Sequence, residues 1–486
     1  MASEAYKRAI STFKGRLIPP YQNRGVAWML SRELSQGSVK GGMMCDEMGL
    51  GKTAQTIAMM LGNPVKRTLI VVPKSVLNQW VGEIGRFAPG FSVGIWDSTK
   101  PEIANYDVVF TTYGMTMNRH KFDDMTYLHR FEWGRIILDE AHEIRNKKSK
   151  AHQSLIRIRS NIRWVLSGTP VFNSMHDFVA LGEFIGIPGK YIQADPSNIR
   201  KSYIMRRTKA DVAEHNSRLA LPPCEFENVE LDMLPEERDI YVSAYTEARN
   251  IILDIFRNSE NVAAHSMNIL EQLLRIRQTM VHPQVYIDGV SKKGDDEHYD
   301  FEHKTAKFEY LERNVRSHPN EKTLIFCQFI REMDLICEMF SDYKVFRLDG
   351  SVSMDQRSQY ISQFNRYDGK TIFVIQIKAG GVGLNLQSAT RVYLTAPSWN
   401  PATELQAIGR SHRTGQTQKV YVKKLIYRLD DDTPSVEQSM MELQGSKSKI
   451  TAEVLNDPRI EKDIPQTNQK GISIRSIRKL FSKSID

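Results

Sequence analysis

The sequence predicts an α/β protein with two parallel-sheet lobes and a helical insertion between them. Short apolar runs alternate with helical stretches in two separate series along the 486 residues, and these runs are rich in Val, Ile and Leu. Continuous apolar runs indicate strands that are buried on both faces, as in a parallel sheet. Residues 172–300 break this alternation and have mostly helical patterns, so the two series are assigned to different lobes.

The expected strands and domains follow in chain order. The strand candidates are residues 42–45, 68–73, 108–112, 135–138 and 164–166, and then 323–327, 345–348, 371–375, 391–394 and 420–422. We predict a first lobe over 1–221 with a helical protrusion from about 172, a helical linker over 222–300, a second lobe over 301–445 and a basic tail over 446–486. The tail is either a short basic amphipathic helix that docks on a partner or on DNA, or a frayed terminus.

Composition limits the class of protein. Hydrophobic residues make up 41% and charged residues 25% of the chain, and no apolar run approaches the ~18 residues that suggest a membrane span. No apolar stretch of a secretory signal follows Met1, so we expect an intracellular protein with no membrane partner. The four scattered cysteines indicate neither a zinc site nor a disulfide framework. A net charge of +9 fits a polyanionic partner.

The stretch from Asp46 to Thr53 reads as a phosphate-binding loop between a strand and a helix. Its Gly-Lys-Thr ending would point backbone N–H groups and a helix N-terminus at one anion. Lys52 would reach the β- and γ-phosphates and Thr53 would ligate Mg²⁺, while Gly49 and Gly51 let the backbone approach closely. Asp46 stands where the pattern has its first glycine, so a Gly-rich turn before a helix is the alternative.

Gln22 lies shortly before this loop, next to a turn that leads into an amphipathic helix. A glutamine amide can pair with both a donor and an acceptor on the edge of adenine. Gln22 could therefore select ATP if the loop binds phosphates. The alternative is a surface glutamine near a helix start.

Two carboxylates, Asp139 and Glu140, directly follow a predicted buried strand. Functional groups of a parallel sheet gather at the carboxyl ends of its strands. A carboxylate at that position can hold Mg²⁺ through its water shell, and its neighbour can orient and deprotonate an attacking water. The alternative is that this acidic pair caps the N-terminus of a helix.

The second lobe has no phosphate loop but carries Arg410 and Arg413. If these residues are helical, their spacing of three places them on one face. An arginine pair that reaches a nucleotide from a second domain can act as an arginine finger, which neutralises charge on the γ-phosphate. The alternative is a pair of surface salt bridges.

Two features of the middle region have simpler interpretations. Residues 268–278 have the spacing of an amphipathic helix, whose apolar face we assign to a core. The basic patch from Ile204 to Val212 reads, by itself, as a solvated face rather than a binding site.

The set of motifs resembles that of the Swi/Snf-type DNA translocases of helicase superfamily 2, over about residues 15–425. The matching segments, in the family's order, are Pro20 to Gln22, Asp46 to Thr53, Pro73 to Trp80 with Glu83, Asp139 to His142, Leu166 to Pro170, Lys378 to Leu386, and Gln406 to Gln416. The family tolerates Asp46. Glu143 and Gln376 depart from its common choices. The motif sequences are most similar to those of the branch that contains the helicase-like transcription factor. This chain lacks the cysteines of the RING insertion that members of that branch often carry.

The resemblance implies two RecA-like lobes, ATP and Mg²⁺ as cofactors, and a role for each matched residue. The implied catalytic residues are Lys52, Asp139, Glu140, Arg410 and Arg413. The implied nucleotide ligands are Gln22, Gly49, Gly51, Lys52, Thr53 and Gln406, and the implied Mg²⁺ ligands are Thr53 and Asp139. The implied DNA contacts are Lys74, Ser75, Thr111, Thr112, Lys378 and Trp399.

The function that the resemblance implies is ATP-dependent translocation along double-stranded DNA, with roles in chromatin remodelling or DNA repair. The lobes would alternate their grips on the phosphate backbone as nucleotide is bound and hydrolysed. A strand-separating DNA or RNA helicase and an ATP-gated DNA-binding scaffold are the rivals. We expect double-stranded DNA as partner, with DNA-bound proteins or nucleosomes beside it, a monomer, and a location in the nucleus or at a site of viral DNA replication.

Overall fold

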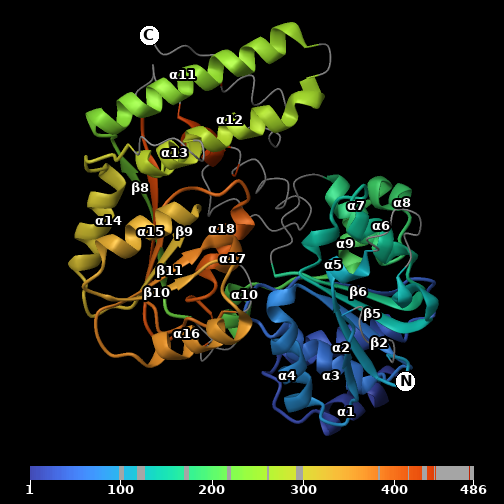
Figure 1. Cartoon of the computed structure of the whole chain (residues 1–486). Coiled ribbons are helices and arrows are strands. Elements are labelled where there is room, and N and C mark those ends of the chain that lie inside the picture. The colour runs from blue at the N-terminus through green and yellow to red at the C-terminus, as the bar shows by residue number, and fades with distance from the viewer. Residues whose placement is uncertain are drawn as a thin grey trace. The chain divides into compact units, whose positions relative to one another are not determined.

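The computed structural model describes residues 1–97, 103–117, 126–168, 175–215, 221–259, 262–291, 299–380, 384–413, 415–429, 435–442, 444 and 481. The chain divides into two compact units, the first extending from Met1 to Leu221 and the second beginning at Pro222 (Figure 1). Each unit is built on its own sheet, and every pairing between described strands is parallel. The predicted fold class is therefore confirmed.

The first unit has a seven-stranded sheet in the order β3-β4-β2-β5-β6-β1-β7. The strands are β1 Lys40–Met44, β2 Thr68–Val72, β3 Val93–Ile95, β4 Val108–Thr112, β5 Trp133–Asp139, β6 Ser160–Leu166 and β7 Ile204–Met205. All five residues of β2 are buried, as the continuous apolar run predicts. Central strands with this pattern need helices on both faces, which the unit supplies.

The helices of the first unit cover the two faces of this sheet. Figure 1 shows α1 Ala2–Thr12, α2 Tyr21–Glu33, α3 Lys52–Gly62 and α4 Leu77–Phe87 in blue, grouped on one side of the strands. The other described helices are α5 Tyr113–Thr116, α6 Lys150–Arg157, α7 Met175–Phe184, α8 Gly189–Ala194, α9 Pro196–Tyr203 and α10 Lys209–His215. Phe178 and Phe184 of α7 are fully buried in the core of this unit.

The second unit has a six-stranded sheet in the order β10-β11-β9-β12-β13-β8. The strands are β8 Cys224–Leu231, β9 Thr323–Cys327, β10 Lys344–Leu348, β11 Thr371–Gln376, β12 Arg391–Leu394 and β13 Val420–Tyr427. The helices labelled in Figure 1 or described with them are α11 Pro235–Asn258, α12 Ser266–Thr279, α13 Pro283–Val290, α14 Ala306–Arg316, α15 Ile330–Met339, α16 Met354–Arg366, α17 Ile377–Gly380 and α18 Pro401–Ile408, and residues 436–442 are helical as well. Figure 1 shows α11 and α12 side by side at one end of this unit.

The helical assignment of residues 222–300 is wrong at its start, because β8 is a strand of the second sheet. It pairs with β13 along its whole length, from Cys224 opposite Val420 to Leu231 opposite Tyr427. Its first four residues are all exposed, and Glu225 and Glu227 form ion pairs with lysines on and beside β13. An edge strand of this kind lacks the continuous apolar run by which the other strands were recognised.

The amphipathic helix predicted at 268–278 is α12, and Ile269, Leu273 and Ile276 are buried in the core that α11 and α12 share. Most of the predicted tail lies outside the described residues. Its Phe481 is buried, with its ring stacked 5.3 Å from that of Tyr245 in α11. Among the described helices, none combines the length and the apolar character that a membrane crossing requires.

A buried ion pair ties α2 to the start of β5 in the first unit. Arg135 Nε and Nη2 donate to the two carboxylate oxygens of Glu33 at 2.6 and 2.5 Å, and neither side chain is more than 1% exposed. The Trp164 indole also donates to Glu33 at 2.8 Å. This arrangement satisfies both charges, whereas removal of one partner would leave the other charged and buried.

We expect Arg135→Met to lower the free energy of unfolding of the first unit by ~3–5 kcal/mol. Urea unfolding followed by tryptophan fluorescence measures this, because all tryptophans except Trp399 lie in the first unit. Lys147→Met is the control, since Lys147 pairs with Glu183 at 2.6 Å but is 42% exposed, and its loss should cost about 1 kcal/mol or less. Equal losses in the two variants would contradict the structural role of the buried pair.

Candidate functional site

The phosphate-binding loop connects β1 to α3 as the sequence predicts. Gly49 and Gly51 have φ values of +92° and +75°, which residues with a side chain rarely adopt. Gly51 directly precedes the first residue of α3. Lys52 and Thr53 are the first two residues of α3, where free backbone N–H groups and the helix dipole favour an anion. Lys52 Nζ donates to the carbonyls of Asp46 and Glu47 at 2.7 and 3.4 Å, so the loop closes around the ammonium group.

The register of the sheet places the carboxyl ends of β1, β5 and β6 beside one another, and with them the phosphate-binding loop, the acidic pair and the motif that begins at Leu166. Met44 of β1 and Asp139 of β5 both pair with Leu166 of β6, so the segments that follow these residues leave the sheet side by side. A Cβ atom on Gly168 would lie 3.0 Å from Lys52 Nζ. The rest of this last motif, Thr169 and Pro170, lies outside the described residues.

Asp139 is held by groups from two other elements. The Trp80 indole of α4 donates to Asp139 Oδ2 at 2.7 Å, and the Tyr113 hydroxyl donates to the Asp139 carbonyl at 2.7 Å. Burial, and then the neighbouring Glu140 carboxylate, raise the pKa of Asp139 to about 6. Sequence reasoning placed Trp80 in a motif without giving it a role. Only the fold shows that its N–H reaches the acidic strand end.

Glu140 has φ of +50° and is 8% exposed. It occupies the cap position of the short helix Ala141–Ile144, but its side chain makes no capping hydrogen bond, which argues against the simple capping alternative. Glu140 Oε2 lies 3.4 Å from Nδ1 of His142. Burial lowers the pKa of His142, but hydrogen bonding and attraction to Glu140 outweigh this effect, so the pKa is raised.

Lys52 lies in the electrostatic field of these acids. The pKa of Lys52 is lowered, because the effect of burial is larger than the opposing attraction to Glu140, Asp46 and Asp139, in that order. The loop and the strand end thus place one cation among three carboxyl groups. A phosphate group and a divalent cation would each find an opposite charge here.

The Gln22 side chain reaches the loop, but its amide oxygen and nitrogen are already hydrogen-bonded to other groups of the protein. Its Oε1 accepts from the Ile18 N–H at 2.7 Å, and its Nε2 donates to the Leu50 carbonyl at 3.2 Å and to the Tyr21 hydroxyl at 3.1 Å. The side chain is only 4% exposed. Gln22 therefore fixes the loop in this structure, and its recognition of adenine stays a prediction.

The predicted DNA contacts of the first unit differ in accessibility. Lys74 is exposed and Ser75 and Thr112 are half-buried, at the ends of β2 and β4. Thr111 is fully buried, and its hydroxyl donates to the Trp96 carbonyl at 3.2 Å. The DNA contact predicted for Thr111 is not supported, because alternation along the strand turns its side chain into the core.

In the second unit the helical placement of the two arginines is wrong. Helix α18 ends at Ile408, so Arg410 and Arg413 lie in turns beyond it. The Gln416 side chain holds these turns by donating to the carbonyls of Gln387 and Ser411, which replaces the helical pattern. Arg410 is 3% exposed, whereas Arg413 is half-buried and donates to the Leu384 carbonyl at 3.5 Å.

The remaining predicted residues of this unit are Lys378, Trp399 and Gln406. Lys378 is exposed on α17, and Gln406 is 8% exposed in α18. Trp399 is half-buried, with the Arg277 guanidinium 5.3 Å from its ring centroid. Residues 381–383 and Thr414 of the matched motifs lie outside the described residues.

Two family models match the chain: the SNF2-related domain over residues 21–195 and the helicase conserved C-terminal domain over residues 306–415. The chain belongs to the SNF2-related family. The two models cover the phosphate-binding loop and acidic strand end in the first unit and the arginine segment in the second. Resemblance to one branch of the family stays a prediction.

Relatives of this family member differ in length. It is 30% identical to human SWI/SNF-related matrix-associated actin-dependent regulator of chromatin subfamily A member 1, over 93% of this chain and 45% of the relative. It is 31% identical to the ISWI chromatin-remodeling complex ATPase ISW1 of Saccharomyces cerevisiae, over 91% of this chain and 41% of the relative. The chain thus spans less than half of these relatives.

Two further relatives are similar to this chain over almost their whole length. The probable global transactivator of Orgyia pseudotsugata multicapsid polyhedrosis virus is 26% identical over 90% of this chain and 91% of the relative. Among solved structures, the Sulfolobus solfataricus SWI2/SNF2 ATPase core in complex with dsDNA is 28% identical, covers 98% of both chains and has a TM-score of 0.41.

We expect Gly51→Ala to destabilise the loop by about 1–2 kcal/mol from backbone strain alone, because φ is positive at this position. The added Cβ would also lie 2.4 Å from Gln22 Nε2 and would displace that amide. Tryptophan-monitored urea unfolding of the first unit measures the loss. Gly82→Ala in α4 is the control, since nothing lies within 4 Å of its Cβ and helix propensity should stabilise it by up to about 1 kcal/mol.

Proposed function

We propose that this chain is an ATP-dependent translocase of double-stranded DNA, of the Swi/Snf type, which remodels DNA-bound proteins. The observation that carries the proposal is the convergence of Lys52, Asp139 and Glu140 at one edge of the first sheet. A helix-terminal lysine beside two strand-end carboxylates is the arrangement that nucleotide hydrolysis needs. Membership of the SNF2-related family supports the same reaction.

Each residue of the edge has a distinct task in this proposal. Lys52 and the N-terminus of α3 bind the β- and γ-phosphates of ATP. Glu140 orients the attacking water and accepts its proton as the bond to the leaving ADP oxygen breaks. The Gly49 and Gly51 backbone lets the loop approach the phosphates.

The oxygen donors at this edge fit Mg²⁺. Thr53 and Asp139 are the residues that would hold the ion, whose charge would neutralise the phosphate oxygens. Burial disfavours the charged form of Asp139, as its raised pKa shows, and a nearby cation would favour that form again. Trp80 keeps the Asp139 carboxylate in one orientation through its 2.7 Å hydrogen bond.

Support for DNA as the partner comes from charge and from the relatives. The chain has a net charge of +9, and Lys74 and Lys378 are exposed at the carboxyl ends of strands in their own units. Relatives of the chain include a chromatin-remodeling complex ATPase and a DNA repair protein of Arabidopsis thaliana, RAD5B, which is 28% identical. We therefore infer nucleosomes or other DNA-bound proteins as substrates, and the nucleus or a site of viral DNA replication as the location.

We expect ATP turnover by the full chain to rise with duplex DNA more than with single-stranded DNA or RNA of equal length. Lys52→Ala should lose nucleotide binding. Glu140→Gln should keep it and lower turnover by ~10²–10⁴-fold, because only the proton acceptor is removed. Phosphate release and binding of a fluorescent ATP analogue measure the two steps. Normal turnover in either variant would refute the assignment, and stronger stimulation by RNA would favour an RNA helicase.

We expect Arg413→Ala to keep ATP affinity within about threefold and to lower turnover by ~10³-fold or more if Arg413 is the arginine finger. Arg413 is chosen over Arg410 because it is the less buried of the two. Arg366→Ala is the control, since this arginine lies on the last turn of α16 in the same unit. An unchanged rate for Arg413→Ala would assign this arginine to the structure of its turn.

A further inference from the structure

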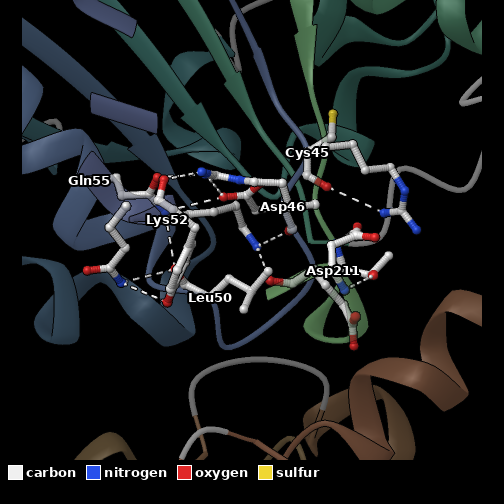
Figure 2. Close-up of polar contacts among 12 residues, drawn as sticks. Cys45, Asp46, Leu50, Lys52, Gln55 and Asp211 are labelled. Atoms are coloured by element: carbon white, nitrogen blue, oxygen red, sulfur yellow. Dashed lines mark hydrogen bonds and ion pairs between the residues drawn. The ribbon is translucent and has the colours of Figure 1, made fainter. Parts of the chain in front are cut away.

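Asp46, which replaces the first glycine of the phosphate-loop pattern, carries a fully buried carboxylate. Arg207 grips this carboxylate with two donors, Nε at 2.9 Å from Oδ1 and Nη2 to Oδ2. Gln55 of α3 completes the network, because its Oε1 accepts from Arg207 Nη2 at 2.8 Å and its Nε2 donates to Asp46 Oδ2 at 3.3 Å. Figure 2 shows Asp46 and Gln55 within these contacts.

The backbone explains why glycine is not needed at position 46. Among the non-glycine residues that the structure describes, only Arg67 and Glu140 have positive φ. Asp46 therefore has a conformation open to any residue, while the special conformations fall on Gly49 and Gly51. The carboxylate is a further feature of this loop, and its charge must be neutralised inside the protein.

The segment around Arg207 runs alongside the phosphate-binding loop. The Cys45 N–H donates to the Met205 carbonyl at 2.7 Å, and the Glu47 N–H donates to the Arg207 carbonyl at 2.9 Å. Lys209 Nζ lies 3.3 Å from Glu47 Oε1, and the Lys209 N–H donates to the other oxygen of this carboxylate. The interpretation of residues 204–212 as a solvated face is wrong, because the side chains of Arg206, Arg207 and Lys209 contact the segment from Cys45 to Glu47.

Apolar packing adds a third contact between the two segments. Val212 of α10 packs with Leu50 of the loop and with Tyr21. The Arg207 guanidinium lies 5.3 Å from the centroid of the Tyr21 ring and donates to the Tyr21 carbonyl. Arg207 thus joins the loop, α3 and the start of α2, which are the three segments that would surround a nucleotide.

We propose that Arg207 is a positioning residue of the nucleotide site, which neutralises Asp46 and holds the phosphate-binding loop in its binding shape. The inference rests on the proposed ATP binding. Without Arg207, a buried negative charge would remain beneath a loop that must attract phosphates. With it, the field from Lys52 and α3 acts on the phosphates without opposition from Asp46. Arg207 touches no phosphate in this account and acts through the loop.

The test is binding of a fluorescent ATP analogue with Mg²⁺, and KM and kcat for ATP, in the full chain. Arg207→Met should weaken nucleotide binding by ~10-fold or more, because the partner charge stays buried. It should raise KM more than it lowers kcat, whereas partial unfolding would lower kcat alone. Arg206→Met is the matched control, since Arg206 donates to the Cys45 carbonyl at 3.4 Å rather than to Asp46, and should change affinity less than about twofold.

Two further variants separate charge from folding. The double variant Asp46→Asn with Arg207→Met removes both charges and should return affinity to within about threefold of the unmodified chain. Arg207→Lys keeps the positive charge but lacks the paired N–H donors of the guanidinium, and this variant should bind nucleotide more tightly than Arg207→Met. A double variant as weak as Arg207→Met, or an Arg207→Met variant that binds normally, would overturn the positioning role.

The outcome also distinguishes this role from the proposed function. An unmodified chain that fails to bind nucleotide would refute the proposed function, and the role of Arg207 with it. An unmodified chain that binds ATP, loses binding in Lys52→Ala and keeps it in Arg207→Met would refute only the role of Arg207. Tryptophan-monitored unfolding of each variant shows that the first unit is folded during these measurements.

Discussion

Parallel pairing within the first sheet is the constraint on which the candidate site depends. Because β1, β5 and β6 run in the same direction and end at the same level, the segments after Met44, Asp139 and Leu166 meet at one edge. Distant parts of the sequence therefore supply Lys52, the two carboxylates and Gly168 to one place. A change of register by one residue would turn the Asp139 side chain to the other face of the sheet.

The two ends of β5 show how the protein treats buried charge. Near its start, Arg135 and Glu33 satisfy one another and stabilise the fold. At its end, the pKa of Asp139 is raised to about 6, since burial and Glu140 disfavour its ionised form. The Trp80 hydrogen bond offsets part of that cost. Buried ionisable groups whose burial cost is only partly offset are common at sites that act on ligands. Asp139 is such a group, and it lies at the proposed Mg²⁺ position.

The second unit uses polar contacts to attach helix α11 to its sheet. Tyr427 of β13 donates to Glu237 near the start of α11 at 2.7 Å, and the Ala306 N–H at the start of α14 donates to the other oxygen of this carboxylate at 3.2 Å. The side chains of Tyr427 and Glu237 are both buried. With β8 paired to β13, they make residues 222–300 part of the second unit rather than a separate linker.

The amino-acid sequence by itself determined most strands, the phosphate-binding loop and the acidic strand end, because local patterns of apolar residues, Gly-Lys-Thr and paired acids encode them. Where those local patterns fail, contacts in the tertiary structure decide the conformation of the chain. The edge strand β8 is stable through pairing with β13, and the arginine segment leaves α18 because distant carbonyls hold it. The contact between Asp46 and Arg207 spans 161 residues, and no local pattern links the two. Only the folded chain could bring this carboxylate and guanidinium together, because burial is what forces each charge to find its partner.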